Sequence, residues 1–118
     1  MKFTKMHGIG NDYIYVNGIS EDVCYDREYI QKISDRHTGV GSDGMIVILA
    51  SEHCDFKMRM FNKDGSEGKM CGNGIRCFAK FVYDHGLTNK ERITVETLGG
   101  NKIVYLDIVN GEVLSAKV

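Results

Sequence analysis

Hydrophobic and polar residues alternate along much of this chain, and that two-residue period predicts β-strands. Within residues 55–61, for example, Phe56, Met58 and Met60 alternate with lysine and arginine, as in a strand with one buried face. The uninterrupted apolar run at 45–49 instead predicts a strand that is buried on both faces. We expect seven strands in all, at residues 2–6, 13–16, 45–49, 55–61, 92–98, 102–109 and 112–118.

Two further segments have the 3.6-residue period of helices. In the first, Asp26 has the side chain of an N-cap, and an apolar stripe continues to about residue 35. The second begins at about Gly72 and stops at Gly86, which has the position of a C′ glycine. Its broad apolar stripe predicts a mostly buried helix and consists of Ile75, Cys77, Phe78, Ala79, Phe81 and Val82.

This order of elements predicts an α+β fold in one domain, residues 1–118. Glycine supplies the turns because proline is absent, and Gly99-Gly100 and Asn110-Gly111 are hairpin signals. A curved, mostly antiparallel sheet around the second helix, at about 72–85, is the simplest packing that buries both. The final strand reaches the last residue, which leaves its edge uncovered, and we therefore expect self-association into a homo-oligomer.

Composition and charge narrow the classes of partner. The formal net charge is −1 and lysine and arginine are scattered, so a nucleic-acid partner is not expected. We expect no membrane contact either, because no apolar run is long enough to span a bilayer and the first residues lack a signal sequence. These features indicate a cytoplasmic protein whose four cysteines, Cys24, Cys54, Cys71 and Cys77, are reduced rather than paired in disulfides.

Cys71 stands immediately before the second predicted helix, where two interpretations compete. A helix amino terminus has unpaired N–H groups and a positive dipole end, which favour a thiolate and can also hold a ligand carboxylate. A base beside an anion site suits removal of a proton from the carbon next to a carboxylate. A small buried cysteine is the other interpretation, and position alone decides between them poorly. Cys77 lies about 9 Å further along the helix at 1.5 Å per residue, and we assign it to core packing.

Two other patterns are misleading. Residues 39–44 match G-x-G-x-x-G, but a helix precedes them and a strand follows, which is the reverse of a dinucleotide-binding site. We interpret residues 39–44 instead as a loop whose backbone needs positive φ. None of the four histidines has zinc-site spacing, so no metal is expected. His85 has the position of a helix carboxy-terminal residue, whereas His7 stays ambiguous. A cysteine-dependent hydrolase or redox protein is a third, weaker alternative, but no sequence feature places a histidine against Cys71.

Four blocks of residues occur in a recognisable order along the chain. They are His7-Gly8-Ile9-Gly10-Asn11-Asp12, then Arg36-His37 with Gly39, Gly41 and Asp43, then Phe61-Asn62-Lys63-Asp64-Gly65-Ser66-Glu67, and finally Met70-Cys71-Gly72-Asn73-Gly74-Ile75-Arg76-Cys77. Together they resemble the diaminopimelate epimerase family, from the first residue to about Gly86. The last block is the most specific, because related isomerases of the same fold lack it, and it favours the catalytic interpretation of Cys71.

The resemblance implies an isomerase that interconverts LL- and meso-diaminopimelate, in lysine and peptidoglycan biosynthesis, without pyridoxal phosphate, metal or any other cofactor. Two cysteines exchange the proton, one on each face of the α-carbon, and Cys71 matches one of them. Gly72 and Asn73 match the backbone donors to the substrate carboxylate, and Asn11 and Asn62 match side chains that contact the substrate. The implied fold consists of two half-barrels, each around a central helix, with the ligand between them.

The chain departs from the family pattern in two respects. Gly44 occupies a position where some members have a substrate-contacting glutamine. The second cysteine belongs to a carboxy-terminal domain that this chain does not include, and the strand that completes the first half-barrel is missing with it. We therefore expect residues 1–118 to form the amino-terminal epimerase domain and to be inactive alone. The alternative is an isolated, non-catalytic domain that binds a carboxylate or an amino acid.

Overall fold

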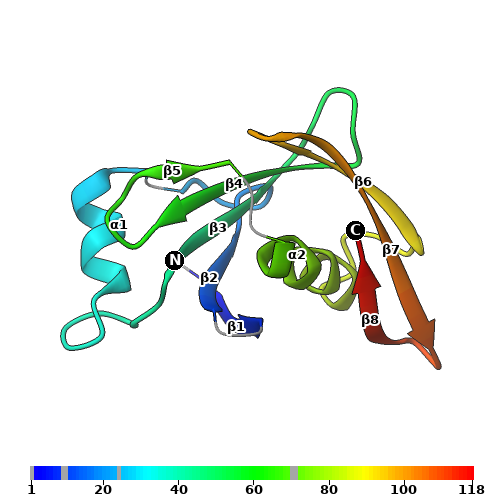
Figure 1. Cartoon of the computed structure of the whole chain (residues 1–118), viewed down its shortest axis with the longest axis horizontal. Coiled ribbons are helices and arrows are strands. Elements are labelled where there is room, and N and C mark those ends of the chain that lie inside the picture. The colour runs from blue at the N-terminus through cyan, green and yellow to red at the C-terminus, as the bar shows by residue number, and fades with distance from the viewer. Residues whose placement is uncertain (1, 9–10, 24, 70–71) are drawn as a thin grey trace.

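The computed structural model describes residues 2–8, 11–23, 25–69 and 72–118. Two helices and eight strands lie within these ranges (Figure 1). In chain order they are β1 Thr4–Gly8, β2 Asn11–Asn17, α1 Arg27–Ser34, β3 Gly44–Leu49, β4 Phe56–Asn62, β5 Glu67–Gly68, α2 Gly72–Asp84, β6 Arg92–Thr97, β7 Gly100–Val109 and β8 Glu112–Lys117.

All eight strands belong to one sheet, in the order β1-β2-β3-β4-β6-β7-β8 with the short β5 paired to β4. The pairs β2–β3 and β4–β6 are parallel and the other pairs are antiparallel. Helix α2 contacts β1 and β2 near one edge of the sheet and β7 and β8 at the other, so the sheet curves around it (Figure 1). The predicted fold, a mostly antiparallel half-barrel around a central helix, is therefore confirmed.

The strands bury side chains on both faces of the sheet. In β2, Tyr13 and Tyr15 belong to the core between the sheet and α2, whereas Ile14 and Val16 belong to the core that Ile30 of α1 covers. This division follows from the alternation of side chains along a strand. Strand β3 contributes to both cores, which explains its uninterrupted apolar run.

The predicted helix ends and turns are confirmed. Asp26 is the N-cap of α1, and its side chain accepts a hydrogen bond of 3.1 Å from the backbone N–H of Glu28. Gly86 has φ +72°, as expected of a C′ glycine after α2. Between β7 and β8, Asn110 and Gly111 have φ values of +54° and +78°, which is the geometry that an Asn-Gly hairpin favours.

The structure corrects the prediction at the first two strands and adds one strand. β1 lies two residues later than expected, and β2 begins earlier, at Asn11, because its first two residues pair with His7 and Gly8 of β1. β5 was not predicted, since two residues are too few to show a period. None of the described helices has the length and apolarity that crossing a membrane would need.

Candidate active site

Three strands bring the predicted site residues to one end of the sheet. β2 and β3 are parallel, so both begin at this end, and β4 is antiparallel to β3 and finishes there. Gly44 at the start of β3 pairs directly with Asn62 at the end of β4, and Asn11 begins β2. Residues far apart in the sequence thus meet along one rim.

Two contacts tie the start of helix α2 to the sheet. Strand β6 runs parallel to β4, and the turn after β6 holds the chain before α2 through a bond of 3.3 Å from Gly99 N–H to Lys69 O. The hydroxyl of Tyr15 donates a buried hydrogen bond of 2.9 Å to the carbonyl oxygen of Gly74. The amino terminus of α2 is therefore fixed to the sheet.

The structure describes the five predicted site residues to different extents. Cys71 lies outside the described residues. Gly72 is the first residue of α2, and a Cβ added there would meet no described atom within 4 Å apart from its chain neighbours and its own helix backbone, so a ligand can approach it. Asn11 and Asn73 are placed in β2 and α2 by their backbones alone, because their side chains are not described. Asn62 is described in full.

A tight turn after β4 holds the side chain of Asn62. Its Nδ2 lies 3.1 Å from Ser66 Oγ, and that hydroxyl lies 2.6 Å from Asp64 Oδ1. The hydroxyl and the N–H of Ser66 both donate to Asp64 and lower the pKa of its carboxyl group. Gly65 completes the turn with φ +88°, which is easily adopted only by glycine. A cavity of about 340 Å³ adjoins this turn and is lined by Tyr13, Asp43, Asn62, Lys63 and Asp64.

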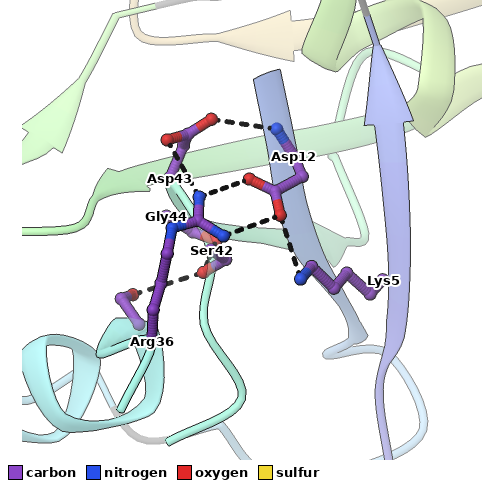
Figure 2. Close-up of polar contacts among 7 residues, drawn as sticks. Lys5, Asp12, Arg36, Ser42, Asp43 and Gly44 are labelled. Atoms are coloured by element: carbon purple, nitrogen blue, oxygen red, sulfur yellow. Dashed lines mark hydrogen bonds and ion pairs between the residues drawn. The ribbon is translucent and has the colours of Figure 1, made fainter. Parts of the chain in front are cut away.

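A charged cluster lies beside this rim, on the face of the sheet that carries α1 (Figure 2). Asp12 is buried, and its carboxylate accepts hydrogen bonds from Arg36 at 2.8 and 3.3 Å and pairs with Lys5 at 3.0 Å. Asp43 accepts from the backbone N–H of Asp12 at 3.0 Å and from Arg36 at 3.4 Å. This cluster joins β1, β2, the segment after α1 and the start of β3.

Hydrogen bonds from Arg36, with those from Lys5, hold the pKa of Asp12 far below its usual value although burial opposes the shift. The same contact raises the pKa of Arg36. Asp12 therefore stays ionised, and the pair fixes the start of β2 against the start of β3. Sequence analysis placed Arg36 and Asp43 in one block but missed the ion pair between Arg36 and Asp12. These two residues are 24 positions apart, and a local pattern gives no signal of such a contact.

Gly44 is required by the close approach of β4. A Cβ at this position would lie 2.0 Å from the carbonyl oxygen of Phe61, which is bound into the sheet and cannot move cheaply. The glutamine that some family members have at the matching position therefore does not fit this backbone.

We accordingly expect Gly44→Gln to lower the free energy of unfolding by about 1–2 kcal/mol, since overpacking at a buried site has costs of this order. Urea unfolding followed by circular dichroism measures the change. Gly99→Ala is the matched control, because a Cβ there would make only ordinary contacts of 3.6 Å. A Gly44→Gln chain as stable as the unchanged one would contradict this interpretation.

The remaining candidates have the structural roles that the sequence predicted. Cys77 is half-buried against the core around α2, with its Sγ 3.7 Å from His7 O, which confirms its assignment to packing. His85 follows α2 and stacks on Phe81, with Nδ1 2.9 Å from Phe81 O. Residues 39–43 form a loop between α1 and β3, with Gly41 at φ +84°, so the dinucleotide interpretation fails.

The amino-acid sequence matches the family model described as diaminopimelate epimerase over residues 3–117. The chain is 58% identical, over all 118 residues, to diaminopimelate epimerases of Methanococcus maripaludis and Acetivibrio thermocellus. It spans 43% and 42% of the lengths of these two relatives, so it corresponds to less than half of each.

Two solved structures of similar fold are an epimerase and an isomerase by name. A hydroxyproline epimerase from Agrobacterium vitis aligns with 97% of this chain and 39% of its own, at 15% identity and a TM-score of 0.73. A methylitaconate-delta-isomerase aligns with 94% of this chain and 35% of its own, at 15% identity and a TM-score of 0.74. At this identity the likeness establishes the fold alone, and it agrees with the half-barrel around α2.

Proposed function

The chain belongs to the diaminopimelate epimerase family, and from this membership we propose that it forms the amino-terminal half of a cofactor-independent isomerase of LL- and meso-diaminopimelate. The observation that carries the proposal is the amino terminus of α2, where Gly72 is open to ligand and Gly74 is bound to Tyr15 of β2, within the sheet whose strand ends carry Asn11, Gly44 and Asn62.

In the proposed mechanism, the Cys71 thiolate removes the α-proton of the substrate. The C–H bond breaks, the proton passes to Sγ, and the electron pair moves towards the carboxylate. The N–H groups of Gly72 and Asn73 bind that carboxylate and stabilise its growing charge. Supporting this, α2 has 13 residues and none of its first four is acidic, so no carboxylate of the helix's own first turn offsets the positive end of its dipole.

One base on one face of the α-carbon removes and returns a proton without inverting the centre. We therefore propose that epimerisation requires a second domain with a second acid–base group, for which the greater length of the relatives leaves room. Residues 1–118 would be the amino-terminal domain and inactive in epimerisation alone. We also propose a cytoplasmic, reducing setting, because Cys71 must stay a thiol, and a product used in lysine and peptidoglycan synthesis.

The stereochemical outcome in D₂O tests this proposal. After incubation with LL-diaminopimelate, chiral chromatography with mass spectrometry should find deuterium at the α-carbon of molecules that keep the LL configuration. Formation of meso-diaminopimelate by this chain would contradict the requirement for a second base. Absence of deuterium would contradict catalysis and leave the isolated binding domain as the better description.

We further propose that the chain self-associates through β8, which is the last strand in the sheet order. Unpaired strand edges attract other strands, and Leu114 in β8 is 59% exposed. The measured mass in light scattering should therefore rise with concentration, and Leu114→Lys should suppress the rise because a charge on an edge opposes pairing. A monodisperse monomer at high concentration would contradict this proposal.

A further inference from the structure

We infer that Ser66, oriented by Asp64, is a positioning residue that sets which end of the Asn62 side-chain amide binds ligand. The inference rests on the proposed function only for the identity of that ligand. It follows from three hydrogen bonds in the turn after β4 and from the single proton that a serine hydroxyl can donate.

The direction of these hydrogen bonds is fixed by the carboxylate. An ionised aspartate can only accept, so at a separation of 2.6 Å the hydroxyl of Ser66 must donate its proton to Asp64 Oδ1. Ser66 Oγ then has only lone pairs to offer Asn62. The atom of Asn62 at 3.1 Å must therefore be Nδ2 rather than Oδ1, whichever way the amide would otherwise turn.

The backbone around Asn62 is also committed. Its N–H donates to Ser66 O at 2.7 Å, and its carbonyl accepts from Gly65 N–H at 2.9 Å. The sheet and the turn thus set the position of the Asn62 side chain, and Ser66 sets which end of its amide faces the turn. The amide has one oxygen acceptor and one remaining N–H left for a ligand.

This pair of groups suits an amino-acid centre, because its ammonium donates and its carboxylate accepts. The adjoining cavity is lined by groups of both charges: Asp43 and Asp64 are negative, and Lys63 is positive. Diaminopimelate has such a centre at each end, so it can present both groups to the Asn62 amide. Reversal of the amide would interchange donor and acceptor and oppose both contacts.

Two variants of Ser66 distinguish orientation of the Asn62 amide from simple support of the turn. The N–H of Ser66 donates to Asp64 Oδ1 at 2.9 Å, and this bond supports the turn without the hydroxyl. Ser66→Ala removes only the contact to Asn62 and the hydroxyl bond to Asp64, whereas Ser66→Thr retains a hydroxyl. The two variants therefore separate orientation of the amide from support of the turn.

The experiment is NMR of the ¹⁵N-labelled chain and its two variants. In the unchanged chain, one side-chain amide proton of Asn62 should exchange slowly with water. In Ser66→Ala its protection should fall about fivefold, the effect of one lost hydrogen bond, and Ser66→Thr should restore it. Equal protection in the unchanged chain and in Ser66→Ala would overturn the inference.

Titration with diaminopimelate then tests the ligand. Ser66→Ala should weaken binding by about fivefold or more while backbone amide signals outside the turn stay in place, and Ser66→Thr should recover it. Unchanged affinity in Ser66→Ala would overturn the positioning role and leave the proposed function intact. No binding by the unchanged chain would overturn the proposed function and the ligand assignment, whereas the exchange measurement would still decide the orientation of Asn62.

Discussion

Cys71→Ala is expected to slow α-proton exchange from diaminopimelate by about 10³-fold, within the range that one positioned acid–base group contributes. In the proposed half-site Cys71 supplies the thiol that takes the α-proton, whereas Gly72 and Asn73 contribute backbone donors. NMR in D₂O measures the effect as the loss of the α-proton signal over time.

Cys77→Ala provides the matched control for this prediction. It removes a thiol from the same region, but that thiol packs against the core and bonds to the His7 carbonyl. Exchange should continue at the rate of the unchanged chain. If Cys71→Ala exchanged the proton as fast as Cys77→Ala, the assignment of Cys71 as the base would be wrong.

Asp12→Asn is expected to lower the free energy of unfolding by about 2–3 kcal/mol at neutral pH, because hydrogen bonds to a charged group contribute about 1.5–3 kcal/mol each. The expected loss is smaller than the sum of these bonds, since Arg36 is more than half exposed and water screens part of its attraction. Urea unfolding measures the loss. Asp107→Asn is the control, because Asp107 is an exposed aspartate in β7 and its replacement should have little effect.

The pH dependence of this loss has a definite sign. The pKa of Asp12 is lowered in the folded chain, so its stabilising contribution is complete above the unfolded pKa of about 4. It is lost as the pH falls from there towards the folded pKa. The stability difference between the unchanged chain and Asp12→Asn should be constant from pH 7 to about 5 and should narrow below about 4. A difference that persists unchanged at the lowest pH would contradict this origin.

Local patterns in the sequence were sufficient for most elements of the fold. Side-chain alternation located β4, the Asn110-Gly111 pair located the last hairpin, and Gly86 marked the end of α2. Patterns could not specify that β2 pairs with β3 and β4 with β6 in parallel, because strand pairing depends on contacts between distant segments. They also missed β5, which is too short to have a period and is supported by the Arg59–Glu67 ion pair.

The candidate site was predictable only in part for the same reason. The helical period placed Cys71 directly before α2, and the family blocks included Asn62. The partnership of Asp12 with Arg36, and the contact that Ser66 makes with Asn62, depend on three-dimensional proximity and side-chain orientation. The need for glycine at position 44 could not be predicted either, since it follows from the close approach of the β4 backbone.

The decisive measurement is a titration of the ¹⁵N-labelled chain with diaminopimelate, following the backbone amide signals of Gly72, Asn73 and Gly74. If the substrate carboxylate binds at the amino terminus of α2, these signals should move downfield together and saturably, in the unchanged chain and in Cys71→Ala alike. If the signals of residues 72–74 stay in place, the proposed site is contradicted, whether or not other signals move.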